Sequence, residues 1–218
     1  MCIRDRYKGL YATREDAEAA DKPISIFPAR DGRVYEMRKL PFGIFIAPKD
    51  NIEELSRTEA GFQPALPLLP YEQFAQIVAF FRSLAVREHP VEAMVDVYWD
   101  SMEEKYLITV PPQKVSGARV FPQGSAQLDP ERYWHTMQIH SHNVMPAFFS
   151  DIDDRSEQAT RIYLVIGRLR DVAPQVRARI SCGGTFVNIR PEQVVETLPG
   201  WFPRHWLRAV HAKGGRTI

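Results

Sequence analysis

The residues in this chain best suited to chemistry are two histidines, a serine and an aspartate that lie close together in the sequence. His140 and His142 are separated by one residue, Ser150 follows after seven more, and Asp153 lies three residues further on. Catalytic zinc is held by three ligands from His, Asp or Glu, and its fourth position is left for water. His140, His142 and Asp153 are therefore candidate metal ligands, and the chemistry that they indicate is metal-assisted hydrolysis.

A strand is the element that would position the two histidines. Residues 136–141 have the pattern of a strand, and residues i and i+2 of a strand point to the same face. His140 and His142 would then face one side together, and Asp153 would reach them if the chain turns back. His135 would point to the opposite face of a regular strand, so we expect it to have a structural role.

Ser150 has two interpretations. It is followed by acidic residues at positions 151, 153 and 154. A serine hydroxyl caps the free amides at a helix start, and carboxylates favour the positive end of the helix dipole. Ser150 is therefore a candidate for a helix cap as well as for a catalytic group.

The arrangement His-Ser-His, seven residues, then Ser-x-x-Asp resembles the signature of the JAMM (MPN-plus, Mov34/PAD-1 type) metallopeptidases. The chain is most similar to the prokaryotic JAB branch of that family, in particular to the protein A group of the plasmid-associated PRTRC cassette. The similarity covers roughly residues 65–198 and is carried outside the metal motif by residues 91–94, 110–113, 147–154 and 162–167. One departure is Asn143, since many family members have proline directly after the second histidine.

The resemblance implies an active site as well as a metal site. Family members carry an upstream glutamate as general base, and Glu92 matches it by order and surroundings, 48 residues before His140. Glu103 and Glu104 are the alternatives, but their sequence is more typical of a solvated hairpin turn. By the same resemblance, zinc would be the cofactor, and Ser150 would donate a hydrogen bond to the tetrahedral oxyanion.

The resemblance also implies a substrate and partners. The expected reaction is cleavage of a peptide or isopeptide bond at or near the C-terminus of a ubiquitin-like protein. A ubiquitin-activating-enzyme-like protein is an expected partner, because the PRTRC cassette encodes one. The alternative is a non-catalytic MPN scaffold that binds partners in a plasmid- or phage-associated system. Scaffolds of this kind usually lose the metal ligands, which are all present here.

The pattern of the chain predicts an α/β protein with three parts. These are a β-rich N-terminal extension over residues 1–64, a catalytic domain over 65–200, and a basic tail over 201–218. Apolar residues at helical spacing predict a helix over 71–88, bounded by Pro70 and Pro90. Strands are expected at 24–27, 33–39, 43–47, 93–99, 106–110, 118–121, 136–141, 162–166, 176–180 and 185–189, and one or two helical turns at 14–20. The resemblance implies the MPN (JAB) fold, a central mixed sheet flanked by helices.

The composition of the chain limits the classes of partner and the cellular location that we expect. The formal net charge is +1, so bulk electrostatics favour neither nucleic acid nor a membrane surface, although the tail after residue 204 is basic. The aromatic residues Trp201, Phe202 and Trp206, at the start of the 201–218 tail, are expected to cover the sheet or to form a contact surface. The chain has no apolar run long enough for a transmembrane helix, and its two cysteines suit a reducing cytoplasm.

Overall fold

The computed structural model describes residues 8–53 and 55–196 of the 218-residue chain. The contacts divide the chain into two compact units, Met1–Glu59 and Ala60–Ile218. The expected basic tail and the aromatic residues Trp201, Phe202 and Trp206 lie outside the described residues. No helix in the described part of the chain is long and apolar enough to cross a membrane.

The N-terminal unit contains a four-stranded sheet in the order β1-β2-β3-β4, with β1 parallel to β2 and the other pairs antiparallel. One short helix, α1, is capped by the Thr13 hydroxyl, which accepts a hydrogen bond from the Asp16 amide at 3.1 Å. A small apolar cluster of Ala17, Phe27 and Met37 holds the helix against the strands. The elements are β1 (Lys8–Leu10), α1 (Arg14–Ala19), β2 (Ile24–Pro28), β3 (Val34–Leu40) and β4 (Gly43–Lys49).

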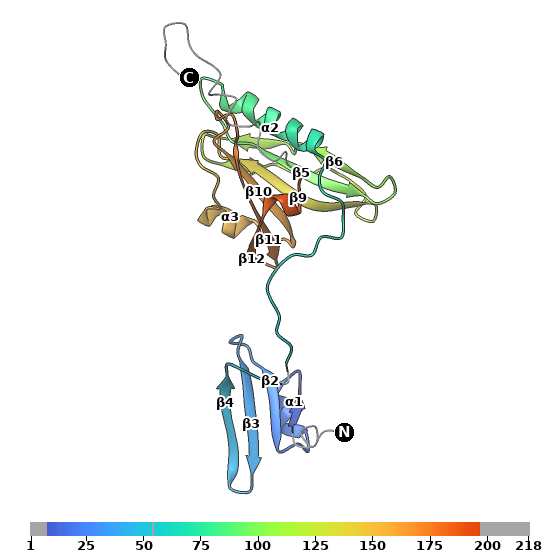
Figure 1. The fold of residues 1–218 in the computed structure, drawn as a ribbon, viewed down its shortest axis with the longest axis vertical. Helices are drawn as coiled ribbons and strands as arrows, with labels where there is room; N and C mark the ends of the chain where they lie inside the picture. Colours follow the sequence, from blue (N-terminus) through green and yellow to red (C-terminus); the bar gives the residue numbers. More distant parts are fainter. Residues whose placement is uncertain (1–7, 54, 197–218) are drawn as a thin grey trace, which may run out of the picture. The chain divides into compact units, whose positions relative to one another are not determined.

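The second unit contains a mixed six-stranded sheet in the order β12-β11-β10-β9-β5-β6 (Figure 1). Strands β9 and β10 are parallel, and every other neighbouring pair in this sheet is antiparallel. A separate hairpin is formed by β7 and β8. The strands are β5 (Met94–Asp100), β6 (Lys105–Thr109), β7 (Gln113–Val115), β8 (Val120–Pro122), β9 (Tyr133–Ser141), β10 (Arg161–Gly167), β11 (Gln175–Cys182) and β12 (Thr185–Ile189), and the helices are α2 (Tyr71–Ala85), α3 (Asp151–Ser156) and a 3-10 turn at Pro191–Gln193.

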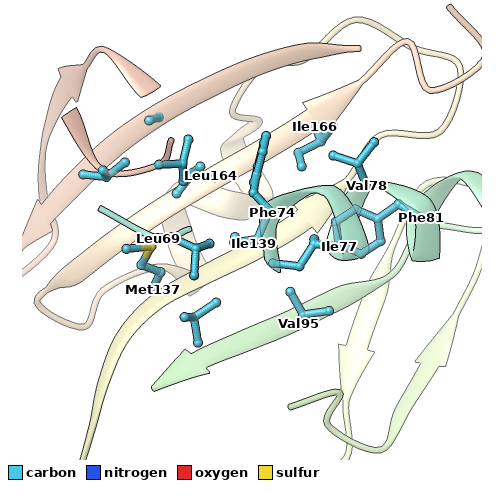
Figure 2. Close-up of a cluster of buried hydrophobic side chains, with 14 of the residues drawn as sticks. Leu69, Phe74, Ile77, Val78, Phe81, Val95, Met137, Ile139, Leu164 and Ile166 are labelled. Atoms are coloured by element: carbon cyan, nitrogen blue, oxygen red, sulfur yellow. The ribbon is translucent and has the colours of Figure 1, made fainter. Parts of the chain in front are cut away.

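Helix α2 covers one face of the six-stranded sheet. Its apolar stripe at i, i+3, i+4 and i+7 is buried at Phe74, Ile77, Val78 and Phe81. These side chains pack on alternate residues of the central strands, as Figure 2 shows for Val95, Met137, Ile139, Leu164 and Ile166. The apolar burial that stabilises this unit is therefore concentrated on one side of the sheet, and the opposite face is left for polar side chains.

The opposite face carries the polar residues of the same strands. Asp96 and Tyr98 of β5 alternate with the core residues Val95 and Val97. The pairing of β5 with β9 shifts between Val97 and Tyr98, a β-bulge that gives β9 one extra residue.

The fold predictions were largely correct for strands. The protein is α/β with a mixed sheet, and all ten expected strands overlap strands of the structure. The predicted helix over 71–88 is found but ends at Ala85, and helical turns are found at Arg14–Ala19. The described chain is mostly strands, with α2 as its one long helix, so the expectation of a sheet flanked by helices is met only in part. Membership of the MPN fold stays a prediction.

The end of β10 lies against the loop that follows β9. A Cβ atom at Gly167 would overlap the backbone of Met145, Pro146 and Ala147. The Arg168 amide donates to the Met145 carbonyl at 2.7 Å, which fixes this loop next to the strand. The loop begins directly after His142, so the close approach at Gly167 helps to set where that histidine lies.

Gly167→Ala is expected to destabilise the protein by about 1–3 kcal/mol, because the added methyl group must displace the loop backbone. Gly61→Ala is the matched control, since a Cβ there meets no atom within 4 Å. Urea unfolding of both variants measures the difference. Equal stability of the two variants would contradict the close packing at Gly167.

Candidate functional site

The two histidines lie at the end of the central strand β9. His140 is paired with Met94 of β5 on one side and with Val165 of β10 on the other. His142 follows the last residue of β9, and its amide donates to the Ile166 carbonyl at 2.8 Å. The Nε2 atoms of His140 and His142 are 3.2 Å apart, and both side chains are buried. Two imidazoles thus present their Nε2 atoms to one point, as the strand prediction required.

Helix α3 supplies the third group. Its N-cap is Ser150, and Asp153 is its third residue. The Asp153 Oδ1 atom is 3.6 Å from His140 Nε2. The Oδ2 atom accepts hydrogen bonds from the Ser150 amide at 2.6 Å and from the Ser150 hydroxyl at 2.7 Å. This capping box confirms the structural interpretation of Ser150 and leaves Oδ1 of Asp153 facing the histidines.

His140, His142 and Asp153 together could hold a metal ion. One ligand atom from each lies within 4.8 Å of the others. Burial lowers the pKa of both imidazoles, which keeps them neutral and able to coordinate a cation. Two neutral nitrogens and one carboxylate oxygen form a donor set that suits zinc and other first-row metals. Phe148 and Phe149 pack edge-on against the two histidine rings.

Glu92 is held near this site by hydrogen bonds between its neighbour Ala93 and Ser141, the last residue of β9. The Ser141 amide donates to the Ala93 carbonyl and the Ala93 amide donates to the Ser141 hydroxyl, both at 2.9 Å. Glu92, adjacent to Ala93, is only 4% exposed. Burial and then the charge of Asp153 raise the pKa of the Glu92 carboxyl to about 7. The carboxyl makes no hydrogen bond or ion pair with another described residue, so it is free to exchange a proton.

The other candidate glutamates lie elsewhere. Glu103 and Glu104 occupy the turn between β5 and β6, and both are exposed. Glu104 has a positive φ of 50°, which is typical of such a turn. The interpretation of this segment as a solvated hairpin turn is confirmed.

The expected orientation of His135 was wrong. The bulge in β9 places Tyr98 opposite His135, while Met94 is opposite His140. Because Met94 and Tyr98 point to the same face of β5, His135 lies on the same sheet face as His140. A regular strand would have turned His135 to the other face, and the sequence carries no clear signal for the extra residue.

Sequence reasoning missed a buried ion pair behind His140. Glu157 Oε1 is 3.6 Å from His140 Nδ1, and Glu157 Oε2 accepts bonds from Arg179 at 2.7 and 2.9 Å. The Arg179 guanidinium lies between the rings of Phe149 and Phe186, 4.0 and 3.8 Å from their centroids. Carboxylates behind a metal-binding histidine fix its tautomer and its orientation. The sequence predicted only a strand at residues 176–180, and it did not indicate that Arg179 of this strand is buried in an ion pair.

Comparison of the chain with models of known protein families gave no match, and comparison with curated proteins gave none either. The interpretation of the site therefore depends on its geometry and on the residues that form it.

Glu157→Gln is expected to weaken metal binding about 10- to 100-fold, since a neutral amide orients the His140 imidazole less strongly than a carboxylate. Competition with a chromophoric chelator measures the affinity for added zinc. Glu131→Gln, a change at an exposed glutamate, is the control and should bind zinc as the wild type does. Unchanged affinity in Glu157→Gln would remove Glu157 from the metal site.

Glu92 should make the stability of the metal-free protein depend on pH. Its folded pKa of about 7 is raised above the ordinary value of 4.5, so its ionisation opposes folding, and stability falls as pH rises between these values. Glu92→Gln should therefore be more stable than wild type by on the order of 2–3 kcal/mol at pH 8, with almost no difference at pH 4. Urea unfolding with a chelator present measures both. A difference that is the same at the two pH values would contradict the raised pKa.

Proposed function

We propose that this protein is a zinc-dependent peptidase or isopeptidase. The observation that carries the proposal is the convergence of His140, His142 and Asp153 beside the buried carboxyl of Glu92. A metal site alone would be compatible with a structural role. A carboxyl group of raised pKa next to an open three-ligand site is instead typical of hydrolytic chemistry.

His140, His142 and Asp153 would hold the ion. When bound in such a site, zinc lowers the pKa of a coordinated water and polarises a carbonyl group. The imidazole ligands favour zinc or a similar transition metal over magnesium or calcium, which prefer oxygen donors.

Glu92 would act as the general base. With a pKa near neutrality, its carboxylate can accept a proton from the attacking water and return it to the leaving amine. Glu92 is tied to the end of β9, because its neighbour Ala93 is hydrogen-bonded to Ser141. These hydrogen bonds help to set the distance between Glu92 and His140.

Ser150 would have two successive tasks. Its hydroxyl hydrogen is donated to Asp153, which orients that ligand. If the hydroxyl turns toward the substrate during the reaction, it can donate to the oxyanion, a contribution of roughly 3–4 kcal/mol in enzymes where such donors were removed.

The wider proposal rests on the resemblance to JAMM metallopeptidases. The α/β unit would then be an MPN domain, and the substrate a peptide or isopeptide bond near the C-terminus of a ubiquitin-like protein. The same resemblance implies a ubiquitin-activating-enzyme-like partner and a cytoplasmic location, and both are part of this proposal. The presence of all three ligand residues favours a catalytic domain over a non-catalytic MPN scaffold.

Cleavage of ubiquitin-like fusion proteins tests the proposed function. Zinc-loaded wild type should release the C-terminal peptide, and Glu92→Gln should lose at least about 100-fold in rate while it still binds zinc, because it lacks only the base. His140→Ala should lose both zinc and activity. Full activity in both variants would refute the proposal, and zinc binding without cleavage of any fusion would favour the scaffold.

A further inference from the structure

Asn143, which directly follows the second histidine, has no task in the proposed chemistry. It is 3% exposed, and its φ of 46° lies in the left-handed region of the backbone. Asparagine is one of the few residues other than glycine that adopt this region readily. Proline, which many JAMM members have at this position, is fixed near a φ of about −65°. The loop after His142 therefore follows a path that a proline would not allow.

The side-chain amide of Asn143 has one hydrogen-bond partner. Its Nδ2 atom donates to the Gly117 carbonyl at 3.2 Å, and its Oδ1 atom is buried without a partner among the described residues. A buried acceptor left unpaired costs about 1–3 kcal/mol, whereas one hydrogen bond contributes only about 0.5–1.5 kcal/mol. Asn143 therefore adds little to stability, and its bond to Gly117 is better explained by what that bond holds in place.

Gly117 lies in the turn between β7 and β8, next to a residue that is bonded to Glu92. The Ser116 carbonyl accepts a hydrogen bond from the Glu92 amide at 2.9 Å. Within the described part of the chain, this bond and the bond from Asn143 are the two hydrogen bonds that join the turn at 116–119 to the rest of the unit. Two adjacent turn residues thus connect the backbone of the candidate base to the residue after His142.

The base of the same hairpin is fixed to β5 by Gln113. Its Oε1 atom accepts a hydrogen bond from the Met94 amide at 2.9 Å, and its Nε2 atom donates to the Met94 carbonyl at 3.0 Å. Met94 is the first residue of β5 and is paired with His140. The hairpin is therefore anchored at its base without Asn143, and its turn is the part whose position depends on Asn143.

The position of the Glu92 carboxyl depends on its backbone, because the carboxyl has no hydrogen bond of its own among the described residues. One restraint on that backbone is the pair of hydrogen bonds between Ala93 and Ser141. The other is the bond from the Glu92 amide to Ser116. Together with the bond from Asn143 to the turn, these restraints close a ring that joins the candidate base to the end of β9.

We propose that Asn143 is a positioning residue for the general base, and this inference rests on the proposed function. Its amide holds the hairpin turn against the site, and the turn holds the backbone of Glu92 at a fixed distance from the metal ligands. Loss of the amide releases the turn but leaves the bond from the His142 amide to Ile166 in place, so zinc binding is kept. A misplacement of a catalytic group by about 1 Å lowers a rate by on the order of 10²-fold.

Asn143→Gly tests the proposal, because glycine adopts the left-handed backbone and only the amide is lost. With fusion proteins as substrate, the zinc-loaded variant should have a kcat at least about tenfold below wild type, with KM and zinc affinity unchanged. A merely structural loss would lower the folded fraction and would not produce this split. Glu104→Gly is the matched control, since Glu104 also has a positive φ, 50°, and lies in an exposed turn.

Amide hydrogen exchange, measured by NMR on the zinc-loaded full chain, gives a readout that does not depend on activity. The Glu92 amide should exchange at least about tenfold faster in Asn143→Gly than in wild type, because its acceptor Ser116 is no longer held. The Ser141 amide, which is bonded to Ala93, should exchange at the wild-type rate. If the glycine variant does not fold, Asn143→Asp replaces it in this measurement, since aspartate has the same shape without the donor.

The outcomes separate this proposal from the proposed function. Faster exchange at Glu92 together with a lower kcat would support the role of Asn143. Unchanged exchange at Glu92 would overturn it, and so would a fall in kcat that added zinc restores, because Asn143 would then act on the metal. If wild type cleaves no fusion, the exchange measurement still decides whether Asn143 positions Glu92, and only the hydrolase is refuted.

Discussion

The hydrogen bonding of β9 to its two neighbours is the constraint on which the rest of the site depends. β9 pairs with β5 on one side and with β10 on the other, and the Ala93–Ser141 connection closes the end that carries His140 and His142. A slip of one residue would turn the histidines toward the apolar core and bring core residues to the polar face. The cost of exposing residues such as Ile139 therefore maintains the orientation of the ligands.

One face of the six-stranded sheet forms the apolar core that stabilises the unit, and the other face carries the polar side chains of the candidate site. Helix α2 buries its apolar stripe against one face, so that face has little room for polar groups. The other face gathers buried charged groups that have polar partners: Arg179 is bonded to Glu157, and Asp96 contacts Gln138 and His135. Buried ion pairs of this kind add little to stability but lose much when one partner is removed. The presence of such a pair behind the histidine ligand is better explained by the positioning of functional groups.

The sequence predicted the parts of this structure that depend on local pattern. The strands follow from alternation, helix α2 from its apolar spacing, and the cap at Ser150 from a serine followed by acidic residues. The three ligand candidates could be chosen because they lie within 14 residues of one another. Glu92 came from a resemblance, since nothing local in the sequence connects it to a strand 48 residues away.

The remaining features could not be predicted because they depend on register and tertiary packing. The bulge that turns His135 to the polar face arises from the pairing of β5 with β9, and neither strand alone reveals it. Glu157 and Arg179 meet because α3 ends beside β11, a proximity that spacing in the sequence does not indicate.

The central claim is that His140, His142 and Asp153 bind a zinc ion at a catalytic position. X-ray absorption spectroscopy of the purified protein, with its metal content, tests this most directly. The account predicts one zinc per chain, with two imidazole nitrogens at about 2.0–2.1 Å and oxygen donors for the remaining ligands. A protein that retains no zinc when supplied with it, or that binds it without imidazole ligands, would contradict the account.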